Sequence, residues 1–419
     1  MGLGAFAVSG LPMGMTKSPA AAALDPVPRH APDDMVDEVA GPPFTPTEAG
    51  AAIALGVIAL LIAGLMSLLL AALAEEHRLS ASGIGLAAMA EALSTGLVTG
   101  AAGILIRPVR LKTIAVVATL ALIALDLATL RASGAGVLAV RTAAGVAEGV
   151  LLWISIGFIS RTATPERWAA VLFTGMGLTQ LIAATGLSAL VLPRFGANGG
   201  YAAVAAAMAL ALPVALLLPS RLGAAQGGGE TAGAPPLRGW VALFGTLCMA
   251  ASLSAVAVYL IPLARQAGLD ISVARATVPV ALACQMLGGV AATAIAGRVR
   301  YLPVFLACAA TFFAAWAVFA FAAPGWLFLA MAGLSGFAAF IAGPFLVPMT
   351  VEADPSRRAA MQSGAVQLLA GAFGPLLASQ VVSEGHVRGV LVMGAGLQLA
   401  GLTVAVVLHR LARSAPPPA

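Results

Sequence analysis

The sequence predicts an all-α integral membrane protein with twelve transmembrane helices, and two observations carry this prediction. Hydrophobic residues make up 60% of the 419 residues and charged residues only 9%, whereas an ordinary soluble protein contains about 25% charged residues. Apolar stretches also follow one another from residue 46 to residue 412, each close to the ~20 residues that one helix needs to cross the hydrocarbon core. The stretches lack the two-residue alternation of a membrane barrel, so helices are the expected spanning elements.

The expected helices are separated by short breaks at charged residues, Pro and Gly. The first helix should begin at Pro46, because Thr45 and Glu48 form a capping box around a proline at the first helical position. The twelve predicted helices cover residues 46–74, 80–106, 111–131, 135–160, 165–192, 200–219, 238–264, 271–297, 301–322, 325–350, 355–383 and 387–412.

The predicted helices fall into two groups of six, divided by a stretch that resembles a soluble linker. This stretch is rich in Gly, Ala and Pro. The region before the first helix carries several prolines and an acidic run, which is typical of a disordered tail. The predicted organisation is a disordered cytoplasmic tail at 1–45, a six-helix bundle at 46–219, a cytoplasmic linker at 220–237, a second six-helix bundle at 238–412 and a short tail at 413–419.

The distribution of Lys and Arg predicts the orientation in the membrane. With a cytoplasmic N-terminus, the inner loops and the C-terminal end hold thirteen basic residues and the outer loops hold six. Basic loops stay on the cytoplasmic side during insertion, so we expect both termini in the cytoplasm, with the protein in a bacterial inner membrane. The formal charge of +5 is thereby explained by topology, and no nucleic-acid partner is expected.

The two predicted bundles share short sequence matches at a nearly constant offset. Residues 164–167 resemble residues 354–357, and residues 79–82 resemble residues 269–272, both at an offset of 190. A third match links residues 177–183 with residues 364–370 at an offset of 187. Each match connects one helix with the sixth helix after it, which indicates a duplicated six-helix unit.

Two related six-helix halves, together with Arg141, Gly145 and Gly149 in an R-x-x-x-G-x-x-x-G pattern on the fourth helix, resemble the major facilitator superfamily. This resemblance implies secondary active transport by alternating access. Residues 103–112 occupy the loop where the superfamily carries G-x-L-a-D-R-x-G-R-K, but Arg107 stands in the place of the Asp. The Gly-Pro signature of its drug exporters is missing from the fifth helix, so the subfamily is not identified.

Four ionisable residues stand out inside the predicted helices, away from the helix ends: Glu91, Asp126, Arg141 and Glu148. Each costs at least ~2.5 kcal/mol in a bilayer and is expected to face the bundle interior. Asp126 and Arg141 lie at matching depths on consecutive antiparallel helices, while Arg141 and Glu148 are two turns apart on one face. We interpret the four as a proton-coupling site. The alternative is a static Asp126–Arg141 lock, with Glu148 bonded to a helix neighbour.

The second half has no ionisable residue near the middle of any predicted helix, so its polar groups there are neutral. Gln180 and Gln367 are related by the repeat and would lie symmetrically across the pseudo-twofold axis, where transporters bind substrate. Alternatively, these side chains only bond one helix to another. The substrate-binding candidates are Gln180, Gln285, Gln367, Tyr259 and Ser252.

These features predict a proton-coupled secondary active transporter of a small organic solute, either a symporter or an antiporter, acting as a monomer in the lipid bilayer. The proton gradient is the expected energy source, with no cofactor and no metal, because the cysteines form no CxxC or His cluster. An enzyme is not expected. The alternatives that stay open are a polytopic membrane enzyme acting on lipid and a non-transporting membrane sensor, and the substrate and the direction of transport are open as well.

Overall fold

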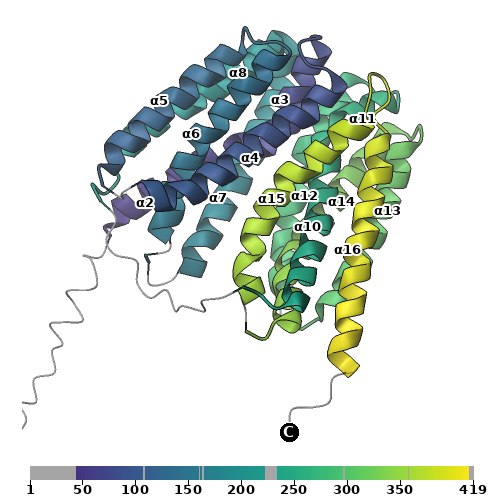
Figure 1. Cartoon of the computed structure of the whole chain (residues 1–419). Helices are drawn as coiled ribbons and strands as arrows, with labels where there is room; N and C mark the ends of the chain where they lie inside the picture. The colour runs from purple at the N-terminus through teal and green to yellow at the C-terminus, as the bar shows by residue number, and fades with distance from the viewer. Residues whose placement is uncertain are drawn as a thin grey trace, which may run out of the picture. The chain divides into compact units, whose positions relative to one another are not determined.

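The computed structural model describes residues 44–106, 109–159, 161–162, 165–221, 234–295, 298–356 and 358–414. Within these ranges the chain forms helices and no β-strand (Figure 1). The predicted tail before residue 44, most of the linker and the last five residues lie outside the described residues, so the predicted domain boundaries stay predictions.

The first half of the chain contains the helices of the first predicted bundle. Its first membrane helix is broken at Leu60, and a short π-helical turn, η1, extends the fifth. The elements are α2 (Pro46–Ala59), α3 (Leu61–Glu75), α4 (Ala81–Leu105), α5 (Leu111–Thr129), α6 (Ala135–Ile159), α7 (Pro165–Gly186), η1 (Leu187–Val191), α8 (Leu192–Ala209) and α9 (Ala211–Leu216).

The second half repeats this plan. The starts of α12, α13 and α14 follow the starts of α4, α5 and α6 at one constant offset, which is the larger of the two offsets that the sequence matches show. We call two residues at this offset repeat equivalents. The elements are α10 (Leu237–Val258), α11 (Leu260–Gln266), α12 (Ile271–Ile295), α13 (Tyr301–Ala320), α14 (Gly325–Ala353), α15 (Arg358–Val381) and α16 (Gly389–Ser414).

The described residues contain eleven helical spans that are long and apolar enough to cross a membrane. One of them, Val171–Leu216, has 46 residues, which at ~1.5 Å per residue would be more than twice as long as the ~30 Å hydrocarbon core. Gly196 breaks it with a φ of 58° and a ψ of −157°, and the Glu76 carboxylate caps the new start by accepting a 2.6 Å bond from the Ala197 N–H. Dividing the span there yields the twelve crossings that the sequence predicts.

Glycines set the closest helix contacts, and they do so in the same way in both halves. In the first half, Gly145 of α6 lies against the Glu91 carbonyl on α4. In the second half, Gly336 of α14 lies against the Ala281 carbonyl on α12. A bare backbone lets two helices approach closely in a membrane, so the duplicated unit keeps one helix crossing in both copies.

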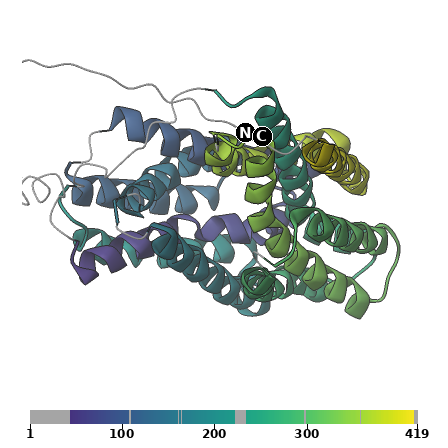
Figure 2. The same ribbon diagram turned by 90° about the horizontal axis from the view of Figure 1, so that it is seen from below.

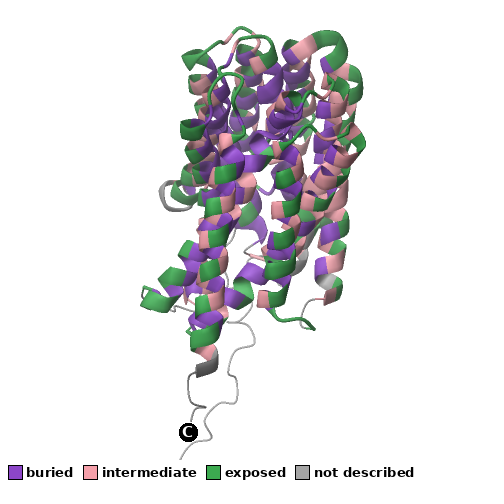
Figure 3. Ribbon diagram, turned by 90° about the vertical axis from the view of Figure 1, so that its right-hand side faces the viewer, coloured by how far each residue is buried: buried purple, intermediate pink, exposed green. Residues whose placement is uncertain are grey.

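The two halves meet along two seams, α4 with α15 and α7 with α12. Figure 2 shows the first half, purple to teal, beside the second half, green to yellow. We call the side where α2 and α10 begin and α16 ends the linker side, and the opposite side the far side. Buried positions run along the inner faces of the helices (Figure 3).

The polar contacts between the halves gather on the far side. Arg275 forms a 2.9 Å ion pair with Glu75, and the Glu384 carboxylate accepts a 2.8 Å bond from the Ala81 N–H. The Tyr259 hydroxyl donates to the Ala81 carbonyl at 2.8 Å and accepts from the Gly85 N–H at 3.0 Å. Among the described residues, no hydrogen bond or ion pair joins the halves on the linker side.

Asp354 organises the linker-side turn between α14 and α15. Its carboxylate accepts bonds from the Ser356 hydroxyl at 2.6 Å, the Ser356 N–H at 3.0 Å and the Ala359 N–H at 2.8 Å. The bond from the Ser356 side chain, with those from the two N–H groups, holds the pKa of Asp354 below its ordinary value. Asp354 therefore acts as the cap of α15.

We expect the Gly145→Ala variant to be less stable than the wild type by about 1–3 kcal/mol. The added methyl group would collide with the Glu91 carbonyl and the Ser94 hydroxyl. Gly96→Ala on α4 is the matched control, because a methyl group there meets no atom within 4 Å. Thermal unfolding in detergent measures both variants, and equal midpoints would contradict the close α4–α6 contact.

We expect the stabilising effect of Asp354 to depend on pH. Because its pKa is lower in the folded protein, its contribution is complete above the unfolded value of about 3.9 and is lost as the pH falls through the folded value. The wild type should therefore unfold at a higher temperature than Asp354→Asn at pH 7, and the difference should shrink below pH 4. A difference that does not change with pH would show that the carboxylate charge is not involved.

Candidate functional site

Helices α4, α5 and α6 bring the four predicted ionisable residues into one enclosed cluster. The relative exposure is 0% for Arg141 and Asp126, 1% for Glu91 and 5% for Glu148. These charges lie in the interior of the first half because α4 and α5 both pack against α6 and each of the three helices carries its charge on the inward face. We call these four residues the charged cluster.

Arg141 is the centre of the charged cluster. One guanidinium nitrogen, Nη2, donates to the Asp126 carboxylate at 2.8 Å and to the Thr129 hydroxyl at 3.0 Å. The other, Nη1, reaches the Glu91 carboxylate at 3.3 Å, and the Tyr201 ring lies 5.1 Å from the guanidinium carbon. The expected Asp126–Arg141 pair is thus present, and Glu91 is a second acidic partner.

Glu148 lies next to Glu91 and has no contact with the guanidinium. Its Oε2 accepts a 3.1 Å bond from the Thr95 hydroxyl, and its carboxyl group lies within hydrogen-bonding reach of the Glu91 carboxyl. The remaining oxygens, Glu148 Oε1 and Glu91 Oε2, are buried and have no donor among the described residues. A proton on either carboxyl group would turn one of its oxygens into a donor.

The charge balance of the cluster leads to the same conclusion. The charged cluster holds three carboxyl groups and one guanidinium group, all buried, so full ionisation would leave an enclosed net charge of −2. An uncompensated buried charge costs several kcal/mol, and two carboxylates in contact repel each other. The arrangement can therefore take up a proton between Glu91 and Glu148 while Asp126 stays paired with Arg141.

Thr95, Thr129 and Tyr201 belong to this site, but the sequence analysis did not single them out. Thr95 lies one helical turn after Glu91, and Thr129 lies just under one turn after Asp126; both positions are on the same helix face as the acid. That spacing was visible in the sequence. Tyr201 is distant in sequence, and only the packing of α8 against α5 brings it to Arg141.

Three of the five substrate-binding candidates already use their polar groups within the protein. The Ser252 hydroxyl bonds the Met249 carbonyl at 2.8 Å and the Gln398 side chain at 2.7 Å. The Gln180 amide donates to the Leu60 carbonyl at 2.7 Å, where α2 breaks from α3. Tyr259 joins the two halves on the far side, as described above. Their geometry is that of helix-to-helix bonding.

Gln285 and Gln367 are different. Both side chains are partly exposed, and neither has a hydrogen bond to another described residue. They lie on α12 and α15, the two helices through which the second half meets the first. Of the neutral candidates, these two have amide groups available for a solute, and their role in binding stays a prediction.

No group of three or more His, Cys, Asp or Glu in the described part of the chain could hold a metal ion. The three carboxyl groups of the charged cluster are already shared with Arg141 and Thr95.

No protein-family model matches the sequence, and no curated protein matches it either. Solved structures do match the fold. The nucleoside transporter NupG aligns with a TM-score of 0.69 at 12% identity, covering 89% of this chain and 100% of NupG. A bacterial homolog to the human lysosomal transporter Spinster, in an inward-facing and unoccupied conformation, aligns with a TM-score of 0.57 at 14% identity, covering 88% of this chain and 96% of the other.

These likenesses define the fold class. The chain has the two-bundle membrane fold of these solved transporters, which confirms the fold that the resemblance to the major facilitator superfamily implies. The proteins named here are transporters and not enzymes. At 12–14% identity, the likeness to these transporters concerns the arrangement of the helices and not the solute.

We expect Asp126→Asn to lower the stability of the protein far more than Glu148→Gln. Asp126 is the shortest-range partner of a fully enclosed guanidinium, and breaking a buried pair costs about 3–5 kcal/mol. Glu148→Gln keeps an oxygen for the Thr95 hydroxyl and should cost less than about 1 kcal/mol. Thermal unfolding in detergent distinguishes the two variants; similar midpoints would show that Asp126 is not the structural counterion.

Proposed function

We propose that the chain is a proton-coupled secondary active transporter that moves a small organic solute by alternating access. The observation that carries the proposal is the excess of carboxyl groups in the charged cluster. Two buried carboxyl oxygens without a donor, on Glu91 and Glu148, make a place for an exchangeable proton. Such groups are costly inside a membrane and are typical of proton relays.

The contacts between the halves support alternating access. The hydrogen bonds and the ion pair that join them lie on the far side, so this conformation is closed there. Opening the far side would require Tyr259 to leave the first turn of α4 and Arg275 to leave Glu75. With both termini in the cytoplasm, as the basic loops favour, the linker side is the cytoplasmic side, and the side that these bonds close is the outer one.

The class of solute follows from the polarity of the second half. Gln285 and Gln367 offer neutral amides, and the middle of the second-half helices carries no charge. Neutral hydrogen-bonding solutes fit this chemistry better than phosphates or polycarboxylates. Because NupG is a nucleoside transporter, nucleosides are the first solutes to test, followed by amphiphilic organic compounds.

The proposal is tested with the purified protein in proteoliposomes under an imposed pH gradient, with nucleosides and a panel of drugs and metabolites as solutes. We expect the gradient to drive accumulation or expulsion by the wild type. Glu148→Gln should keep exchange of solute down its own gradient and lose the pH-driven component by about tenfold or more; side chains that transfer protons in enzyme catalysis contribute roughly 10²–10⁴-fold.

Glu48→Gln is the matched control, because it removes an acid at the exposed start of α2 and a glutamine keeps the capping box. It should transport like the wild type. Full pH-driven transport by Glu148→Gln would refute the proton-coupling role of Glu148. A wild type that moves none of the panel in either direction would count against transport of neutral organic solutes.

A further inference from the structure

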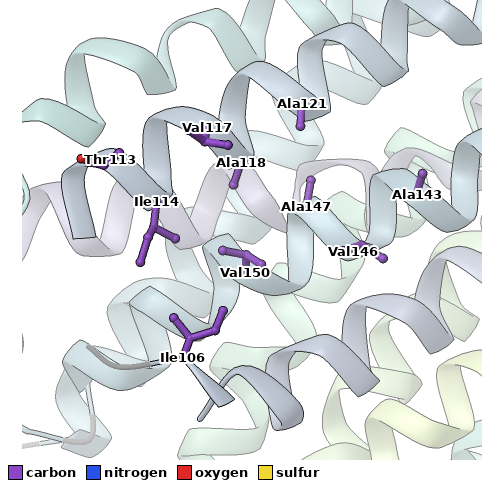
Figure 4. Close-up of a pocket in the computed structure, with 10 residues that line it drawn as sticks. All are labelled: Ile106, Thr113, Ile114, Val117, Ala118, Ala121, Ala143, Val146, Ala147 and Val150. Atoms are coloured by element: carbon purple, nitrogen blue, oxygen red, sulfur yellow. The ribbon is translucent and has the colours of Figure 1, made fainter. Parts of the chain in front are cut away.

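A cavity of about 410 Å³ lies between α5 and α6 (Figure 4). Ile114 and Ala118 of α5 face Ala147 and Val150 of α6 across it, and Ile106 closes one end. Its walls are almost entirely apolar, and alanines on both helices leave the space. We call it the α5–α6 groove.

The α5–α6 groove opens on the outer surface of the bundle. Val146 and Val150 each lie two residues from Glu148, which is about 200° around an α-helix, so they point away from the charged cluster. Val117 and Val146 on its rim are 61% and 44% exposed. In a membrane-spanning protein, this outer face meets the hydrocarbon of the bilayer.

Along α5, the groove is nearly as long as one leaflet of the bilayer is thick. It runs along α5 from Thr113, near the linker side, to Ala121. The eight helical steps from Thr113 to Ala121 span ~12 Å, which is about two fifths of the ~30 Å hydrocarbon core. A groove of this length, open to the bilayer, has the dimensions for an acyl chain of a lipid in the leaflet on the linker side.

The mouth of the groove is basic. Arg110 and Lys112 are exposed at the linker-side start of α5, beside Thr113 and Ile114 of the groove. Neither side chain forms a hydrogen bond or an ion pair with another described residue. The sequence contains no Asp or Glu between residues 92 and 125. Two cations at the helix start next to the apolar groove complement a phosphate that carries a fatty acyl chain.

We propose that the α5–α6 groove binds an anionic phospholipid, with one acyl chain in the groove and the phosphate against Arg110 and Lys112. A basic residue near an anionic membrane surface contributes about 1 kcal/mol, so the two together favour an anionic over a zwitterionic lipid by ten- to thirtyfold. This site is separate from the proton and solute chemistry proposed above.

The second half offers a control at the repeat-related positions. Arg300 is the repeat equivalent of Arg110 and likewise precedes a helix, α13. Phe337 and Phe340 of α14 are the repeat equivalents of Ala147 and Val150. The second half thus keeps a basic helix start but carries bulky rings where the first half has small side chains.

The test uses the full-length protein, purified and delipidated, and native mass spectrometry with phosphatidylglycerol and phosphatidylcholine of identical acyl chains. We expect the wild type to retain phosphatidylglycerol at least about tenfold better. Arg110→Gln/Lys112→Gln should lose this preference and keep the weaker phosphatidylcholine binding. Val150→Phe should lose both lipids several-fold, and Arg298→Gln/Arg300→Gln should bind like the wild type.

Three outcomes would overturn the proposal. They are equal retention of the two lipids by the wild type, full phosphatidylglycerol binding by Val150→Phe, and displacement of the lipid by free glycerol phosphate, which would mean that the phosphate alone is held. A cooperative thermal unfolding transition shows whether each variant is folded. Should Val150→Phe not fold, Thr113→Trp blocks the groove at its mouth, and the same loss of binding is expected.

Discussion

The enclosed guanidinium of Arg141 is the constraint on which the first half of the structure depends. A charge at this depth is tolerated only with partners, and those partners come from α4 and α5, whereas Arg141 itself belongs to α6. The three helices must therefore keep the relative heights that bring these side chains within reach of Arg141. Gly145 and Gly149 of α6, which lie directly on the backbone of α4, make that arrangement possible.

The two halves share a scaffold and differ in chemistry. The repeat equivalents of the four members of the charged cluster are Ala281, Trp316, Met331 and Ala338, so the second copy carries no charge there. Its Trp316 instead packs against Phe312 and Phe313. Duplication preserved the helix crossings, which depend on small residues at the contacts, while the interior groups diverged. A transporter built this way would couple to protons in one half and present neutral groups from the other.

The charged cluster also shows how far spacing along a helix can predict a site. The Asp126–Arg141 pair was predictable, because two consecutive antiparallel helices bring equal depths together. Glu91 was expected only to face the bundle interior, and the structure turns it toward Arg141. Ser252 and Tyr259 were predicted as solute contacts from their depth and polarity. Their hydroxyls bond other helices instead, and depth alone does not distinguish these uses because it says nothing about the direction of the side chain.

The sequence by itself determined the membrane class, the approximate extent of most membrane helices, the duplication and the presence of costly charges inside the bilayer, but not the breaks at Leu60 and Tyr259. Hydrophobic length, caps and breakers are local properties of the chain, so they can be recognised without the fold. Tertiary structure decided which carboxyl groups share Arg141, which polar side chains remain available, and where the halves touch. It also formed the α5–α6 groove, since a space between two helices depends on their separation and rotation, which residues far apart in sequence set together.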